Sequence, residues 1–311
     1  MISGAFTQRL PPLSLHWHPT QVNPKGCFMN RRHFVSLLGL STLALGCAGP
    51  GRFVPEPTHG FVARQISTPQ GPHRFFVYKP RHVGTQEKLP VILYLHGGGE
   101  RGEDGVAPTQ VGLGQVVQAA LGYFPFLVVF PQCKSGGFWG APDMAARAMQ
   151  ALAVAIHDFG GDPERVYVTG NSLGGYGTYL LASRYPGQFA ALAPICGGVK
   201  PPPLVSVPKG DSLFDLNGDV YAQLAERLGR TPVWIFHGES DPLVPPKISV
   251  KIAQALREHA GRREPGLTQL TIWPGVGHTA EEPTYNMPQL FDWFLQHRLK
   301  SATDVGNTAL R

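Results

Sequence analysis

The chain has 311 residues, of which 42% are hydrophobic and 15% are charged, and its formal net charge is +6. This length and apolar content suit one large α/β domain with a single core. The basic residues Arg9, Lys25, Arg31 and Arg32 precede Cys47 with no acidic residue among them, which leaves +2 for the remainder. Charge therefore gives no reason to expect a nucleic-acid partner.

The amino-terminal residues have the pattern of a targeting segment. The pair Arg31-Arg32 precedes an apolar run at 37–45, which is similar to a twin-arginine export signal. Residues 43–47 resemble a lipobox, although Ala44 stands where that motif prefers leucine, so Cys47 is either a lipid anchor or part of a simple cleaved signal. We expect export to the periplasm or anchoring at the cell envelope.

The segments around this signal divide the chain. We expect translation to begin at Met29, with 1–28 an upstream extension and 29–47 the export signal. A Pro/Gly-rich linker follows at 48–60, one folded domain covers 61–300, and 301–311 form a flexible tail.

Strand and helix patterns alternate along the domain. The expected strands are 61–67, 74–78, 89–95, 126–130, 165–169, 190–196, 233–236 and 270–273, and the expected helices are 143–158, 175–184, 220–228, 246–259 and 288–298. This alternation predicts a mostly parallel, doubly wound sheet with an antiparallel hairpin at its amino-terminal edge. The segment between the strands at 190–196 and 233–236 is too short and too rich in Pro and Gly for a large cap.

The most informative motif is Gly170-Asn171-Ser172-Leu173-Gly174, which joins the strand at 165–169 to a helix. Such a tight bend needs small residues on both sides of the serine and projects its hydroxyl above the sheet edge. A G-x-S-x-G pattern alone is weak in a chain with 38 glycines, but its strand-before, helix-after setting makes it specific. The arrangement is typical of the nucleophile elbow of α/β-hydrolases, with Ser172 as the nucleophile.

A serine hydroxyl needs a base and an orienting acid, which in this fold follow the serine in the order acid, then histidine. Asp241 lies in a proline-bounded turn after the strand at 233–236, and His278 lies on a glycine-containing loop after the strand at 270–273. Glu239 is the nearest alternative acid. We interpret His237 as a packed histidine at a strand end.

The run 89–95 is the most apolar strand and opens onto His96-Gly97-Gly98-Gly99-Glu100. In α/β-hydrolases a backbone N–H of this loop and that of the residue after the nucleophile bind the oxyanion. We expect Gly98 and Leu173 as donors, with Gly97 or Gly99 as alternatives to Gly98. Residues 97–102 also fit a dinucleotide-binding fingerprint, but a charged loop follows instead of a helix, and no acidic residue lies at 106–141.

Other candidate positions are less specific. Trp139 and Tyr176, with Gly97 and Gly99, are candidates for the substrate pocket, although the alternative that both aromatic residues pack against the sheet is slightly favoured. Cys133 and Cys196 follow strands that are not expected to be neighbours, so we interpret them as buried thiols. No metal-binding spacing is present, and we expect no metal and no cofactor.

Several motifs together resemble one known family: L-H-G-G-G-E-R-G at 95–102, P-Q-C at 131–133, R-V-Y-V-T-G-N-S-L-G-G-Y-G-T at 165–178, A-P-I-C-G-G at 193–198, F-H-G-E-S-D-P-L-V-P at 236–245 and P-G-V-G-H at 274–278. Over 91–298 the chain resembles bacterial α/β-hydrolases described as peptidases, phospholipase/carboxylesterases and feruloyl-esterase-like proteins. The resemblance implies a triad of Ser172, Asp241 and His278 acting on small acyl or aryl esters, free or linked to carbohydrate. A peptidase or amidase with the same triad, and a non-catalytic binding protein on this fold, remain alternatives. The oligomeric state stays open.

Overall fold

The computed structural model describes residues 59–81, 88–202, 212–259 and 264–299, all of which belong to one compact unit, Glu56–Arg311. The predicted upstream extension, the export signal with Cys47, all but the end of the linker and the carboxyl-terminal tail lie outside the described residues. Among the helices that are described, none has the length and apolar character needed to cross a membrane.

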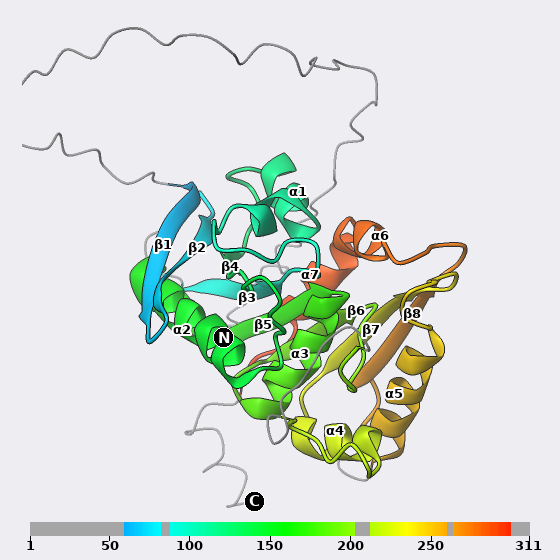
Figure 1. The fold of residues 1–311 in the computed structure, drawn as a ribbon. Helices are drawn as coiled ribbons and strands as arrows, with labels where there is room; N and C mark the ends of the chain where they lie inside the picture. Colours follow the sequence, from blue (N-terminus) through cyan, green and yellow to red (C-terminus); the bar gives the residue numbers. More distant parts are fainter. Residues whose placement is uncertain (1–58, 82–87, 203–211, 260–263, 300–311) are drawn as a thin grey trace, which may run out of the picture. The chain divides into compact units, whose positions relative to one another are not determined.

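Eight strands form one sheet in the order β1-β2-β4-β3-β5-β6-β7-β8. The strands are β1 (Gly60–Thr68), β2 (Gly71–Lys79), β3 (Leu89–Leu95), β4 (Leu127–Phe130), β5 (Gly161–Asn171), β6 (Ala191–Ile195), β7 (Val233–Gly238) and β8 (Thr268–Trp273). The β1–β2 and β2–β4 pairs are antiparallel and all the others are parallel. The predicted parallel sheet with an antiparallel hairpin at one edge is confirmed (Figure 1).

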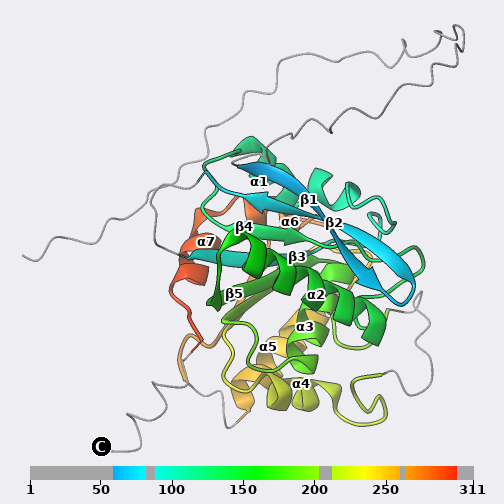
Figure 2. The ribbon, with the colours of Figure 1, turned by 90° about the vertical axis from the view of Figure 1, so that its left-hand side faces the viewer.

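Helices lie on both faces of this sheet (Figure 2). They are α1 (Leu113–Ala119), α2 (Pro142–Phe159), α3 (Leu173–Arg184), α4 (Val220–Leu228), α5 (Lys247–Glu258), α6 (Glu281–Tyr285) and α7 (Pro288–Leu295), with a 3-10 turn at Ala107–Gln110. Successive strand residues face opposite sides of a sheet. Accordingly, Val166 and Val168 of β5 belong to the core formed with α2 and α3, whereas Tyr167 stacks on Phe294 of α7, with ring centroids 4.7 Å apart.

Between β6 and β7, the described residues form the single helix α4, which agrees with the expected lack of a large cap. Two short helices, α1 and α6, were not predicted, and β5 begins at Gly161 rather than at Arg165. The β-branched run that predicts this strand starts only at Arg165, after Pro163. The β3–β5 ladder is irregular there, between Leu89 and Val91, so the proline interrupts no regular pairing.

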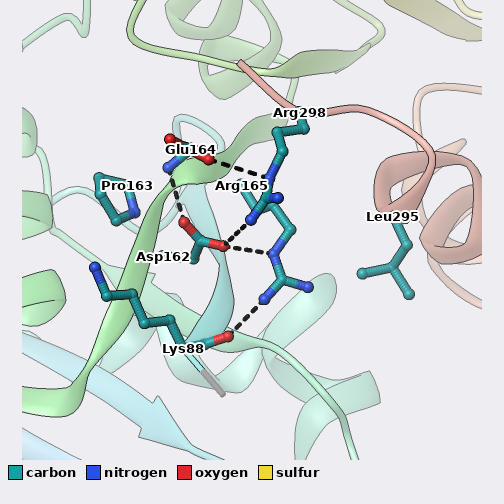
Figure 3. A pocket seen from close by; sticks show the side chains of 7 residues that line it. All are labelled: Lys88, Asp162, Pro163, Glu164, Arg165, Leu295 and Arg298. Atoms are coloured by element: carbon teal, nitrogen blue, oxygen red, sulfur yellow. Dashed lines mark hydrogen bonds and ion pairs between the residues drawn. The ribbon is translucent and has the colours of Figure 1, made fainter. Parts of the chain in front are cut away.

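A cluster of charged residues joins the start of β5 to the residues that follow α7 (Figure 3). The carboxylate of Asp162 accepts hydrogen bonds from Arg165 Nε at 2.7 Å and from a terminal nitrogen of Arg298 at 3.0 Å, while Glu164 pairs with Arg298 Nε at 3.2 Å. Burial by itself raises the pKa of Asp162, but the Arg165 bond, the Glu164 N–H and the Arg298 bond hold that pKa below its usual value. The cluster surrounds a hollow of about 590 Å³ at the amino-terminal end of β5, opposite the end that carries Ser172.

Candidate active site

Ser172 lies in a strained bend between β5 and α3. Its φ of 53° and ψ of −117° fall in a region that residues with a side chain rarely adopt. A Cβ at Gly170 or at Gly174 would overlap the carbonyl oxygen of Leu95 at the end of β3. Both glycines of the motif are therefore required by the close approach of the bend to β3, and the bend is fixed further by a 2.9 Å bond from Ser172 N to Ile195 O.

The structure brings the three sequence-predicted polar residues together. His278 Nε2 lies 2.7 Å from Ser172 Oγ, and His278 Nδ1 lies 2.7 Å from Asp241 Oδ2. The ionised carboxylate of Asp241 can only accept a hydrogen bond, so Nδ1 of His278 carries the proton. The lone pair on Nε2 of His278 then faces the Ser172 hydroxyl. The rival acid, Glu239, instead accepts the N–H of Gly275 at 2.9 Å. Of these two carboxylates, Asp241 is the one that bonds this imidazole.

The carboxylate of Asp241 is buried and satisfied by donors. Its Oδ1 accepts the backbone N–H groups of Leu243 and Val244, both at 2.9 Å. Burial raises the pKa of Asp241, but the Val244 N–H, the His278 imidazole and the Leu243 N–H together hold that pKa below its usual value. Asp241 therefore stays ionised behind His278.

The loop after β3 lies beside Ser172: a Cβ on Gly97 would stand 3.9 Å from the Ser172 Cβ. Within the described residues, no acceptor bonds the N–H groups of Gly97, Gly98, Gly99 or Leu173, so all four are available for an anion. Gly97 lies next to Ser172 and Gly99 is exposed, but neither observation decides which loop N–H binds the oxyanion together with the N–H of Leu173. The assignment of Gly98 stays a prediction.

Two side chains hold this loop in place. His96, fully buried, accepts the N–H of Cys133 at Nε2 (2.9 Å) and donates from Nδ1 to the carbonyl of Gly97 (2.6 Å). Burial lowers the pKa of His96 to about 4, so the imidazole is neutral at pH 7. Arg101 donates from Nε to the carbonyl of Gly98 at 2.9 Å and from a terminal nitrogen to Gly137 O at 3.3 Å. Because the carbonyls of Gly97 and Gly98 are hydrogen-bonded, the peptide groups of this loop keep a fixed orientation.

Known protein families and curated proteins match parts of this sequence. The Carboxylesterase family model matches residues 75–189, and the Esterase family model matches residues 152–280. "Poly(3-hydroxyalkanoate) depolymerase C" of Paucimonas lemoignei is 33% identical over 135 residues, which cover 38% of this chain and 30% of the relative. "Probable acetylxylan esterase A" of Aspergillus fumigatus is 28% identical over 181 residues, 53% of this chain and 46% of the relative.

Among solved structures, a thermostable esterase superposes with a TM-score of 0.58 at 26% identity, covering 76% of this chain and 63% of that one. The chain has the α/β-hydrolase fold, and both of its partial family matches are to esterases. The chain spans less than half the length of these two curated relatives.

Two candidate pocket residues, Trp139 and Tyr176, lie in the hydrophobic core. Trp139 is fully buried, and its indole N–H donates to the carbonyl of His96 at 3.0 Å. Tyr176 is 5% exposed and packs under Gly198. The expectation that they line a substrate pocket is corrected to the packing alternative: a rim residue would need an exposed face, and the polar atom of Trp139 is already bonded inside the protein.

The two described cysteines, Cys133 and Cys196, are buried free thiols, in agreement with the sequence interpretation. Cys196 also belongs to a cluster that the sequence did not reveal: one ligand atom each of Cys196, His237 and Asp241 lie within 4.8 Å of one another. These donor types suit a zinc ion. However, His237 Nε2 lies 2.8 Å from the carbonyl of Val244, which requires a proton on that nitrogen, so its lone pair is not available to a metal.

Proposed function

We propose that the protein hydrolyses carboxylic esters of small acyl or aryl groups through an acyl-enzyme formed on Ser172. The observation that carries the proposal is the pair of 2.7 Å contacts that link Ser172 Oγ, His278 and Asp241. A hydroxyl is a weak nucleophile until an adjacent base takes its proton, and a neutral imidazole oriented by a buried carboxylate is such a base.

The reaction proceeds in two halves. Ser172 Oγ attacks the ester carbonyl while its proton passes to His278 Nε2; the tetrahedral intermediate then collapses, and the same proton goes to the departing alcohol. A water molecule next gives a proton to His278 and attacks the acyl carbonyl; when this second tetrahedral intermediate collapses, the proton on His278 passes to Ser172 Oγ and the acid is released. Asp241 stays ionised throughout and stabilises the imidazolium.

The oxyanion of each intermediate would be bound by the N–H of Leu173, at the start of α3, and by that of Gly98. The free donor groups of the loop after β3 and its position beside Ser172 support this assignment. Loss of one such donor lowers transition-state stabilisation by about 3 kcal/mol.

Two other functions are compatible with parts of the site. A peptidase or amidase would use the same three side chains, and the turnover of matched aryl esters and aryl amides separates it from an esterase. A binding protein on a decayed hydrolase fold would not need the short contact between Ser172 Oγ and His278 Nε2, which favours an enzyme.

The test is covalent labelling with a fluorophosphonate. The wild-type protein should be labelled on Ser172 and lose hydrolysis of aryl esters, whereas Ser172→Ala should fold, resist labelling and be inactive. Ser183→Ala is the matched control, because Ser183 is a buried serine of α3. A folded wild-type protein that is not labelled would refute the proposal. Acetyl, butyryl, octanoyl and feruloyl esters then define the acyl preference.

A further inference from the structure

A second imidazole lies against the carboxylate of Asp241. His237, the fifth residue of β7, is fully buried, and its Nε2 lies 3.3 Å from Asp241 Oδ2. This is the oxygen that His278 Nδ1 contacts at 2.7 Å. The acid of the proposed triad is therefore shared by two histidines, only one of which contacts Ser172.

The hydrogen bonds of His237 define which nitrogen carries its proton. Nε2 lies 2.8 Å from the carbonyl of Val244, which can only accept, so Nε2 carries a proton; the same nitrogen lies 3.3 Å from Asp241 Oδ2. Nδ1 lies 2.7 Å from the hydroxyl of Ser249, which donates to it. Burial lowers the pKa of His237, which favours this neutral form. Ser249 of α5 thus fixes the tautomer that places an N–H on Nε2, beside the carboxylate.

The remaining side of Asp241 is closed by Cys196. This residue follows β6 with a φ of 46°, and its N–H donates to Phe236 O at 3.0 Å. Burial raises the pKa of the Cys196 thiol to about 12, so it is protonated and faces the carboxylate as an S–H. Burial, together with the nearby Asp241 carboxylate, raises the pKa of Tyr176 of α3 to about 12, so this phenol is neutral. The side chains of His237, Cys196 and Tyr176 near this carboxylate are therefore neutral, and His278 is the group that becomes cationic during the reaction.

We infer that His237 is a positioning residue: its Nε2–H, fixed by Ser249, holds Asp241 Oδ2 in line with His278 Nδ1. The two backbone N–H groups fix Oδ1, and a donor on Oδ2 prevents the carboxylate from rotating about its Cβ–Cγ bond. The same donor withdraws part of the negative charge from Oδ2, so the carboxylate orients the imidazole without overstabilising its charged form. The inference rests on the ester hydrolysis proposed above.

The inference is tested with two substitutions of different chemistry. His237→Leu removes the donor, whereas His237→Gln keeps an N–H at the position of Nε2. For His237→Leu we expect kcat/KM to fall about tenfold with KM nearly unchanged. The acid limb of its kcat/KM profile should move to higher pH, because a carboxylate with fewer donors holds the imidazolium more strongly. His237→Gln should restore most of both properties.

The control is Tyr78→Phe, which removes a buried hydroxyl that accepts from Gly122 N at 3.0 Å and donates to Phe124 O at 3.3 Å. It should lower stability without moving the pH profile. If His237→Leu does not fold, Ser249→Ala replaces it: loss of the hydroxyl leaves Nδ1 without its donor and should shift the profile in the same direction by less.

Proton NMR tests the position of Asp241 without relying on turnover. The downfield proton resonance of the His278 Nδ1–H that bonds Asp241 should change in His237→Leu and return in His237→Gln. An unchanged resonance and pH profile in a folded His237→Leu, with kcat/KM within twofold of wild type, would overturn the inference. A wild-type protein that neither hydrolyses esters nor reacts with fluorophosphonate would instead refute the proposed function, and the resonance would still report whether His237 positions Asp241.

Discussion

The backbone N–H of Ser172 donates to the carbonyl of Ile195, the residue directly before Cys196. Ser172 and Cys196 are the two non-glycine residues with positive φ in the described part of the chain. Each follows a strand, and β5 and β6 are neighbours in the sheet. Such backbone strain costs of order 1–3 kcal/mol per residue and persists only where the surroundings enforce it. The two bends therefore form one strained unit that places Ser172 toward His278 and Cys196 toward Asp241.

The elbow should not tolerate a side chain at Gly174. A Cβ there would overlap the carbonyl oxygen of Leu95, a backbone atom of a central strand that cannot move aside. We expect Gly174→Ala to lose more than about 3 kcal/mol of unfolding free energy or to accumulate as insoluble protein. Urea denaturation measures this. Gly99→Ala is the control: no atom lies within 4 Å of its Cβ position, so stability should change by less than about 0.5 kcal/mol. Equal stability of the two variants would contradict the close approach.

The site residues that could be predicted are those that follow a strand end. The apolar strand patterns place the carboxyl ends of parallel strands at one edge, so Ser172, Asp241 and His278 were expected to meet there before any distance was known. This prediction needs only the residue types in the loop after each strand and the order of the strands along the chain.

The features that could not be predicted depend on tertiary contacts. Whether His237 reaches Asp241 depends on the turn through Gly238 and Ser240, which periodicity does not describe. The sequence left Trp139 between pocket and core because the acceptor of its indole N–H, the carbonyl of His96, lies far away in the sequence. The helices α1 and α6 have only seven and five residues, and tertiary packing stabilises such short helices more than sequence propensity does.

Arg101 should matter for catalysis more than for folding. It bridges the carbonyls of Gly98 and Gly137, and a lysine cannot reach both with a planar fork. We expect Arg101→Lys to lower kcat about tenfold, because the loop donors would be less well oriented toward the oxyanion. Kinetics with an aryl ester measure this. Arg184→Lys, which removes a 3.2 Å bond to the carbonyl of Gly140 away from that loop, should leave kcat unchanged. A similar loss in both variants would argue against a role for the Gly98 contact.

His96 should make stability depend on pH. Burial lowers its pKa from 6.5 to about 4 in the folded protein, so between these values the unfolded chain holds more protons than the folded one. The contribution is complete above pH 6.5 and is lost as the pH falls toward 4, about 3 kcal/mol in total. His96→Gln should reduce the slope of unfolding free energy against pH in this window by up to about 1.4 kcal/mol per pH unit. His157→Gln, at an exposed histidine, should keep the wild-type slope. An unchanged slope in His96→Gln would show that another group causes the dependence.

The charged cluster at the start of β5 should affect stability and leave catalysis intact. Asp162→Asn removes the charge shared by Arg165 and Arg298 but keeps an oxygen for the N–H of Glu164. We expect a loss of about 1–2 kcal/mol at pH 7. The folded pKa of Asp162 is depressed, so this difference between wild type and variant should vanish as the pH falls through that pKa. Asp158→Asn, at a more exposed pair with Arg64, should cost less. Because Ser172 follows the opposite end of β5, about 30 Å along the strand, kcat should stay at the wild-type value in both variants. A fall in kcat for Asp162→Asn alone would show that the two ends of β5 are coupled.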